Sequence, residues 1–184
     1  MKHKAVFVDK DGTLVPDIPY NVNTSLITLE RCVAEGLLAL QCAGYKIVIV
    51  SNQSGIGRGF FTVEQFHDVQ VKMETLLAEH GISLEGFYYC PHVPDDNCTC
   101  RKPRPGLILQ AANELMIDPR CSWMIGDILN DVQAGKSAGC QTVLIDNGNE
   151  TEWILNEERT PDFTAKNFKE AAKYILIHEC VGQL

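Results

Sequence analysis

The chain has 184 residues, of which 45% are hydrophobic and 22% charged, as expected of a globular protein with a full core. Its formal net charge of −8 argues against nucleic acid as a partner, because binding a phosphate backbone needs clustered Lys and Arg. No apolar run approaches the roughly 18 residues that span a bilayer, and a core strand follows Met1–Lys4 directly. We therefore expect no membrane partner, no signal peptide and a cytoplasmic location.

Short apolar strands alternate with helical segments along the chain. The strands are expected near residues 5–8, 46–50, 86–89, 122–125 and 142–145. The helices are expected near residues 29–43, 62–80 (from the capping box Thr62–Gln65 to Gly81), 106–116, 130–138 and 168–180. This alternation predicts an α/β fold, a doubly wound parallel sheet in one domain over residues 1–184. In such a fold the ligand site lies at the carboxyl ends of the strands.

The first expected strand ends in the run Asp9-Lys-Asp-Gly-Thr13. Two carboxylates 4 Å apart repel by about 4 kcal/mol at an effective dielectric near 20, so a cation or a retained proton is needed between them. Gly12 allows a sharp turn, and the Thr13 hydroxyl can face an anion. The alternative is a solvated acidic turn, but a pair of carboxylates at the end of a buried strand favours a catalytic or cation-binding role. We interpret Lys10 as structural, because strand alternation turns it away from its two neighbours.

Further polar groups follow the later strands. Ser51 comes after the strand near 46–50, Lys102 lies beyond the third strand, and the run Gly126–Asp131 follows the fourth. Together with the first run, and in this order, they resemble the four motifs of the haloacid dehalogenase superfamily. Most members of that superfamily are phosphatases that work through an aspartyl phosphate. The resemblance implies the superfamily's Rossmann-like sheet.

The same resemblance implies a role for each motif residue. Asp9 would be the nucleophile and the Asp11 side chain the general acid–base. Mg²⁺ would bind Asp9, the backbone carbonyl of Asp11 and Asp127, while Asp131 would bond to a metal-bound water or ligate directly. The phosphoryl oxygens would be held by the Ser51 hydroxyl, the Asn52 backbone N–H and the Lys102 ammonium.

Residues 90–102 contain candidate ligands for a second metal. Three thiols and one imidazole make a closed tetrahedral site, which suits a structural Zn²⁺. The metal would staple the loop that presents Arg101 and Lys102. A chance cluster in a chain with eight cysteines is the alternative. The expected ligands are Cys90, His92, Cys98 and Cys100. The other cysteines, interpreted as buried small hydrophobes, are Cys32, Cys42, Cys121, Cys140 and Cys180.

Within the superfamily the zinc loop resembles two groups, the D-glycero-D-manno-heptose 1,7-bisphosphate phosphatases and the histidinol-phosphate phosphatases. Ser51–Gly59 and Arg101–Gly106 favour the heptose group, whose substrate belongs to lipopolysaccharide precursor synthesis. The short zinc loop fits the histidinol-phosphate group, and Leu29–Val33 departs from the helix opening common in the family. A sugar phosphate substrate is therefore implied. The expected substrate contacts are Thr13, Asp17, Tyr20, Asn52, Gln53, Ser54 and Arg101. Arg58 is a further candidate, with a solvated surface residue as the alternative.

Chain length limits the architecture around this site. Only about forty residues separate Asp11 from Ser51, which leaves no room for a cap domain, so we expect an open site. We also expect the protein to be a monomer. Two functions of another class remain. A phospho-accepting receiver also uses acidic residues, a hydroxyl and a Lys, but takes its phosphoryl group on a middle strand and has no use for a zinc loop. A catalytically silent zinc-stapled module is disfavoured, because every catalytic position is filled.

Overall fold

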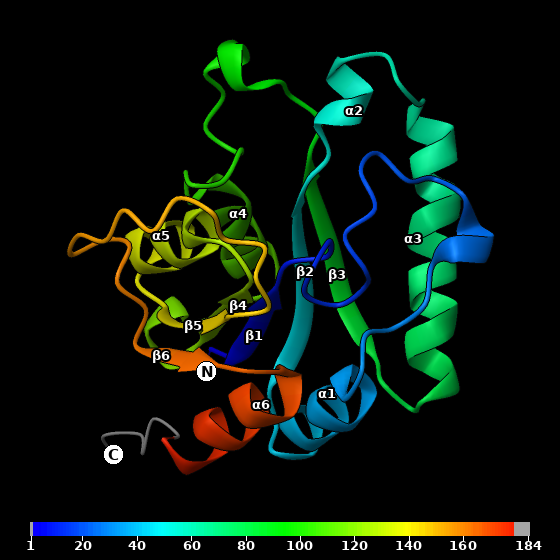
Figure 1. Cartoon of the computed structure of the whole chain (residues 1–184). Coiled ribbons are helices and arrows are strands. Elements are labelled where there is room, and N and C mark those ends of the chain that lie inside the picture. Colours follow the sequence, from blue (N-terminus) through cyan, green and yellow to red (C-terminus); the bar gives the residue numbers. More distant parts are fainter. Residues whose placement is uncertain (1, 179–184) are drawn as a thin grey trace.

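A computed structural model describes residues 2–178 and shows one parallel sheet with helices on both faces (Figure 1). The spatial order of the strands is β3-β2-β1-β4-β5-β6, and every neighbouring pair is parallel. The order reverses direction between β1 and β4, which is where ligands bind in doubly wound sheets. The strands are β1 Ala5–Val8, β2 Lys46–Asn52, β3 Leu84–Cys90, β4 Trp123–Gly126, β5 Gln141–Ile145 and β6 Phe163–Ala165.

The apolar composition of the central strands follows from their position between two helical layers. In β1, Val6 and Val8 face one hydrophobic cluster while Ala5 and Phe7 face the other, and all four are fully buried. The first cluster lies under α1 (Val33–Cys42), α3 (Val63–Glu79) and α6 (Phe168–Ile177), and the second under α4 (Gly106–Glu114) and α5 (Leu129–Ala138). Figure 1 shows these layers, with the short α2 (Ser54–Gly57) beyond the end of β2.

The expected strands and helices are present, with shifted ends. No pattern in the sequence predicted β6, which has three residues. The first helix begins at Val33 instead of near Leu29, because Cys32 adopts a left-handed conformation with φ of 67°. The capping box of Thr62 and Gln65 opens α3 as expected. The predicted end of the last helix at Cys180 lies outside the described residues. Short 3₁₀ turns not expected from the sequence occur at Thr24–Leu26, Pro94–Asp96 and Pro119–Cys121.

The interpretation of the isolated cysteines as buried was wrong at several positions. Cys140 is buried, but Cys42 is exposed on α1, and Cys32 and Cys121 are half-buried. Each stands near the end of a helix or turn, where the apolar pattern that suggested burial stops. Cys180 lies beyond the part of the chain that the structure describes.

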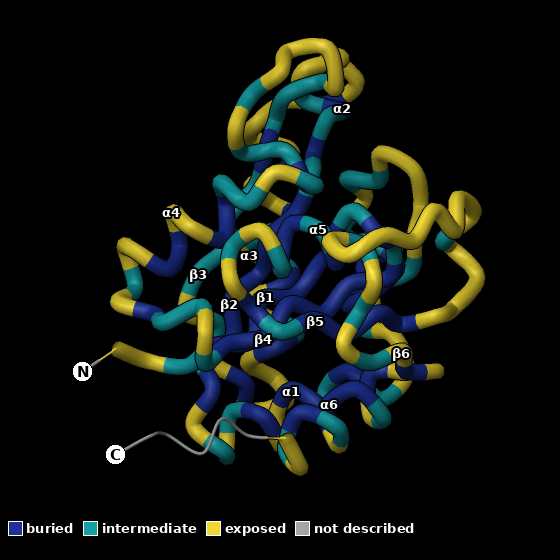
Figure 2. The backbone as a smooth tube through the Cα atoms, turned by 90° about the vertical axis from the view of Figure 1, so that its left-hand side faces the viewer, coloured by how far each residue is buried: buried dark blue, intermediate teal, exposed yellow. Residues whose placement is uncertain are grey.

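Between β1 and β2, residues 9–45 contain one 3₁₀ turn and α1, which packs against α6, and no inserted domain. The carboxyl ends of the strands are therefore bordered by loops, the short α2 and the start of α5, and by no cap domain in the described part of the chain. Figure 2 shows the buried strands at the centre and the more exposed loops near α2 at one end. Among residues 2–178 there is no helix long and apolar enough to cross a membrane.

Candidate active site

Three buried carboxylates meet at the carboxyl ends of β1 and β4. Asp9 follows β1 and is held in register by its backbone N–H, which donates to the Ile125 carbonyl of β4 at 2.9 Å. Asp127 follows β4, and Asp131 lies in the first turn of α5. One oxygen from each carboxylate lies within 4.8 Å of the others. The arrangement offers a hard divalent cation the oxygen ligands it prefers.

Lys102 reaches this cluster from the side of β2, whose residues bind both its side chain and its backbone. Its ammonium contacts Asp9 Oδ1, lies 2.6 Å from Asp131 Oδ1 and donates to the Val50 carbonyl at 3.0 Å. The residue is 3% exposed. Its backbone is paired with the Asn52 amide, which donates to the Lys102 carbonyl at 3.1 Å and accepts from the Lys102 N–H at 3.0 Å. The end of β2 thus fixes a lysine fifty residues away in sequence.

The second expected carboxylate of the first motif, Asp11, faces the end of β2. Gln53 links it to the buried Ser51: the Gln53 amide donates to Asp11 Oδ2 at 2.9 Å and to Ser51 Oγ at 2.8 Å. Lys10 was expected to turn away, and this was wrong. Its side chain is 2% exposed and its ammonium contacts Asp11 Oδ1.

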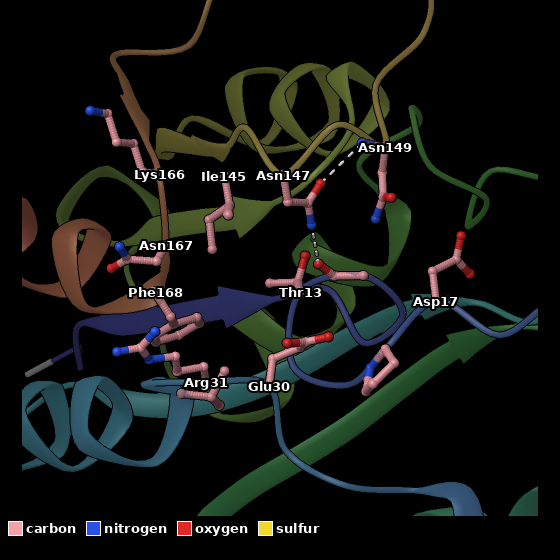
Figure 3. A pocket seen from close by; sticks show the side chains of 13 residues that line it. Thr13, Asp17, Glu30, Arg31, Ile145, Asn147, Asn149, Lys166, Asn167 and Phe168 are labelled. Carbon is pink, nitrogen blue, oxygen red and sulfur yellow. Dashed lines mark hydrogen bonds between the residues drawn. The ribbon is translucent and has the colours of Figure 1, made fainter.

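Two side chains hold the Asp127 carboxylate by hydrogen bonds that the sequence did not predict. Thr13, expected to face substrate, donates its hydroxyl to Asp127 Oδ1 at 3.2 Å, and the Asn149 amide donates to Oδ2 at 2.7 Å. Asn147 joins the two loops, because its amide donates to the Gly12 carbonyl at 2.6 Å while its oxygen accepts from the Asn149 N–H at 3.1 Å (Figure 3). The position of these asparagines could have predicted their place at the site, because they follow β5 at the same edge of the sheet.

Two glycines allow the close approach of these groups. Gly12 has φ of +81°, and a Cβ there would lie 2.1 Å from Asp127 Oδ2. A Cβ on Gly126 would lie 2.2 Å from Asp131 Oδ2. Any side chain at either position would displace a carboxylate of the cluster.

The electrostatics of the site also favour a cation. Burial, together with the charges of Asp131, Asp127 and Asp11, raises the pKa of Asp9 although Lys102 opposes the shift. Burial, then Asp131, raises the pKa of Asp127 to about 6. Burial lowers the pKa of Lys102, but Asp131 and Asp9 outweigh it, and the net shift is upward. Four carboxylates, including Asp11, face the two ammonium groups of Lys10 and Lys102, which leaves a formal charge of −2 that one divalent cation balances.

The site opens into neighbouring clefts. A cleft of about 200 Å³ contains the three carboxylates with Asp11, Asn52 and Lys102. Beside it, about 310 Å³ lies between residues 17–21 and residues 52–55, so Asp17, Tyr20, Gln53 and Ser54 border the same space. Another, of about 310 Å³, lies behind Thr13 and Asn147 (Figure 3). A further cleft of about 330 Å³ is lined by Arg101, Arg104, Lys102 and Asn130.

The loop that contains Tyr20 contacts the loop that contains Phe60. Tyr20, in a left-handed conformation with φ of 56°, packs edge to face against Phe60 with ring centroids 4.7 Å apart. Phe60 was not expected at the site. Arg58, in the same loop, is exposed.

The predicted zinc ligands cluster beyond β3. Cys90 ends that strand, and the four side chains offer ligand atoms within 4.8 Å of one another. The Cys90–Cys100 sulfurs are 3.2 Å apart, and His92 Nδ1 lies 3.3 Å from the Cys100 sulfur. These distances are a little shorter than the edges of about 3.6–3.8 Å in a tetrahedron with Zn–S near 2.3 Å and Zn–N near 2.1 Å. A donor set of three thiols and one imidazole fits Zn²⁺.

The cysteine cluster is tied to both arginines of the following segment. Arg101 Nη1 donates to the His92 carbonyl at 3.4 Å, and Arg104 Nη1 donates to the Cys98 carbonyl. Burial raises the pKa of Cys98, but the Arg101 N–H and the neighbouring thiols outweigh it and lower the pKa to about 7. Burial raises the pKa of Cys90, with the hydrogen bond to Cys100 acting in the same direction. The pKa of one thiol of the cluster thus lies below that of an ordinary cysteine.

Known proteins similar in sequence are phosphatases, which agrees with the chemistry that this site suggests. Residues 99–171 match the family model described as HAD-hydrolase-like. The chain is 43% identical over 152 residues to the D-glycero-β-D-manno-heptose-1,7-bisphosphate 7-phosphatase of Pasteurella multocida, covering 79% of this chain and 83% of the relative. It is 39% identical over 171 residues to the enzyme of the same name from Helicobacter pylori strain 26695, covering 91% and 95%.

A solved structure of a heptose bisphosphate phosphatase has the same fold as this chain. The D,D-heptose 1,7-bisphosphate phosphatase from B. bronchiseptica, complexed with magnesium and phosphate, superposes with a TM-score of 0.84 at 30% identity. The match covers 95% of this chain and 98% of that one. The chain therefore belongs to the haloacid dehalogenase-like family of D-glycero-β-D-manno-heptose-1,7-bisphosphate 7-phosphatases.

Proposed function

We propose that this protein is a Mg²⁺-dependent phosphatase that removes the 7-phosphate of D-glycero-β-D-manno-heptose 1,7-bisphosphate through an aspartyl phosphate. The observation that carries the proposal is the convergence of Asp9, Asp11, Ser51 and Lys102 at one sheet edge, in a chain of that family. All four residues come from a single chain, which supports a monomer as the active form.

In the first step, a carboxylate oxygen of Asp9 attacks phosphorus as the bond between phosphorus and the C7 oxygen breaks. The Asp11 carboxyl gives its proton to that oxygen, which leaves as the sugar alcohol. Ser51, the Asn52 N–H and Lys102 hold the equatorial phosphoryl oxygens as their charge shifts. Lys102 already lies against Asp9, so it reaches both the nucleophile and the incoming oxygens.

In the second step, water attacks the phosphorus of the acyl phosphate and its proton passes to Asp11. The phosphorus–Asp9 bond breaks, which releases inorganic phosphate and regenerates the carboxylate. Mg²⁺ held by Asp9, the Asp11 carbonyl and Asp127 would supply the positive charge that lets an anionic nucleophile approach an anionic phosphate. Asp131, which contacts Lys102 and faces both carboxylates, would orient that set. Thr13 and Asn149 hold the Asp127 carboxylate in place.

Zn²⁺ on Cys90, His92, Cys98 and Cys100 would have a structural role. A closed set of four protein ligands leaves no open position for substrate. The loop 91–101 contains only one short 3₁₀ turn, so the metal would supply the rigidity that regular structure does not.

Phosphate release from a substrate panel tests the proposed function. The panel contains the heptose bisphosphate, histidinol phosphate and 4-nitrophenyl phosphate. We expect the highest kcat/KM for the heptose bisphosphate, with the 1-phosphate retained in the product. A higher kcat/KM for histidinol phosphate would replace the heptose assignment with the histidinol-phosphate one. Absence of Mg²⁺-dependent release from every member would contradict the phosphatase assignment.

Arg101→Ala should reduce kcat/KM for the bisphosphate more than for 4-nitrophenyl phosphate. Arg101 lines the cleft beside Lys102, where it would meet polar groups of the substrate beyond the transferred phosphate. Loss of a charge-assisted contact of about 1.5–3 kcal/mol corresponds to a roughly ten- to hundredfold decrease. Arg120→Ala, which removes an exposed arginine paired with Asp118, is the matched control. Equal losses on both substrates would show that Arg101 does not discriminate between them.

Without metal, the contribution of Asp127 to the stability of the fold should decrease as the pH rises from about 4 to about 6. The folded pKa of Asp127, about 6, exceeds the value near 3.9 of an unfolded Asp. At Asp127 the folded state therefore binds more protons in this window, and this residue alone lowers the free energy of unfolding by about 2–3 kcal/mol across it. Urea unfolding in chelator at several pH values measures this, with Asp127→Asn for comparison. The slope should flatten in the variant; identical slopes would contradict the assignment.

A further inference from the structure

Lys10 is a buried cation at the site that the mechanism above does not use. Its side chain is 2% exposed, against 30% for Asp11, and its ammonium contacts Asp11 Oδ1. Burying an ammonium is unfavourable unless a charge partner and hydrogen bonds compensate for the lost water. Asp11 is the partner shown for it, so the two side chains form one unit.

The conformation of the loop directs Lys10 toward Asp11. The Lys10 carbonyl accepts hydrogen bonds from the N–H groups of Leu14 at 2.9 Å and Val15 at 3.1 Å, which closes a tight loop directly after β1. Gly12 supplies the positive φ that this loop needs. Because the extended conformation ends before Lys10, side-chain alternation no longer applies there.

Asp11 is held at both oxygens. Lys10 contacts Oδ1, while the Gln53 amide donates to Oδ2 at 2.9 Å. The two donors come from different loops, one after β1 and one after β2, and they leave the carboxyl little freedom to rotate. Asp11 is shared by the 200 Å³ cleft of the carboxylates and the 310 Å³ cleft that Lys10, Gln53 and Asp17 border. It therefore stands between the nucleophile and the space available to a leaving group.

We propose that Lys10 is a positioning residue that, with Gln53, holds the Asp11 carboxyl between the nucleophile and the leaving-group cleft for its two proton transfers. The proposal rests on the proposed function and deepens it. A general acid acts only when its oxygen lies within hydrogen-bond distance of the atom that receives the proton. Loss of the Lys10 contact would free one side of the carboxyl and slow the steps in which Asp11 moves a proton.

Single-turnover kinetics of Lys10→Met, which keeps a similar length without the charge, test this role. An aryl leaving group such as 4-nitrophenolate needs no proton, whereas an alkyl oxygen does. We expect phosphoryl transfer from 4-nitrophenyl phosphate to stay within about threefold of the wild type, and transfer from the sugar phosphate to fall by tenfold or more. The time course with the aryl substrate should show a pre-steady-state burst followed by slow steady-state turnover, because the second step also uses Asp11.

Two further variants keep the result interpretable. Lys46→Met removes a lysine paired with Glu85 at the opposite end of β2 and should leave both rates unchanged. Lys10→Arg keeps a cation that can donate to Asp11 and should recover part of the rate with the sugar phosphate. If Lys10→Met, folded by circular dichroism, slows transfer from both substrates equally, or from neither, the positioning role is overturned. Activity of the wild type on the two substrates tests the proposed function separately.

Discussion

Asp9→Asn is expected to lower phosphate release by at least a thousandfold, which is about 4 kcal/mol of lost transition-state stabilisation. The amide that replaces the carboxylate is a poor nucleophile toward phosphorus and a weaker ligand for Mg²⁺. The substitution preserves size in a residue that is only 8% exposed, so the packing around β1 should persist. Release of phosphate by purified variant and wild type, at saturating substrate and Mg²⁺, measures the effect.

The control is Asp68→Asn, which makes the same change on the exposed face of α3 and should leave turnover unaffected. Zinc content and circular dichroism establish that Asp9→Asn is folded. If the folded variant keeps a tenth of the wild-type turnover, Asp9 is not the nucleophile. In that case Asp127 and Asp131 would need to be tested as the attacking group, because they are the other carboxylates of the cluster.

The sequence predicted the residues that converge because the topology of a parallel sheet makes convergence almost unavoidable. Asp9, Ser51 and Asp127 lie at strand ends that share one edge, so recognising the strands was sufficient to bring them together. The clustering of Cys90, His92, Cys98 and Cys100 was predictable for another reason. Their spacing in a short loop limits how far apart they can lie, whatever the detailed conformation.

The side-chain contacts of loop residues were not predictable in the same way. The error at Lys10 came from extending strand alternation one residue beyond the point where the chain turns. Asn147 and Asn149 flank Gly148, a composition that indicates a turn, and nothing local predicts that they would hydrogen-bond to Gly12 and Asp127. Their role depends on the loop after β1, more than a hundred residues earlier, which approaches them only in the folded sheet. Tyr20 and Phe60 likewise meet across two loops whose conformations no pattern specified.

Replacing both Cys98 and Cys100 by Ser should abolish zinc binding and lower activity by at least tenfold. Metal analysis of the wild type, purified without chelator, should give close to one zinc per chain, and the double variant close to none. The sheet should remain folded, because both hydrophobic clusters are built mainly from strands and helices outside the loop. Cys32→Ser with Cys42→Ser is the matched control, since neither residue belongs to the cluster.

The loss should differ between substrates, because the two cations of the loop are anchored differently. Lys102 keeps two hydrogen bonds to Asn52 on β2 that do not depend on the metal. Arg101 is attached through the His92 carbonyl, inside the stapled loop, and loses its support when the loop loosens. We therefore expect kcat/KM for the bisphosphate to fall further than kcat/KM for 4-nitrophenyl phosphate. Negligible zinc in reduced, fully active wild-type protein would contradict the structural zinc, and equal losses on both substrates would show that Lys102 also depends on it.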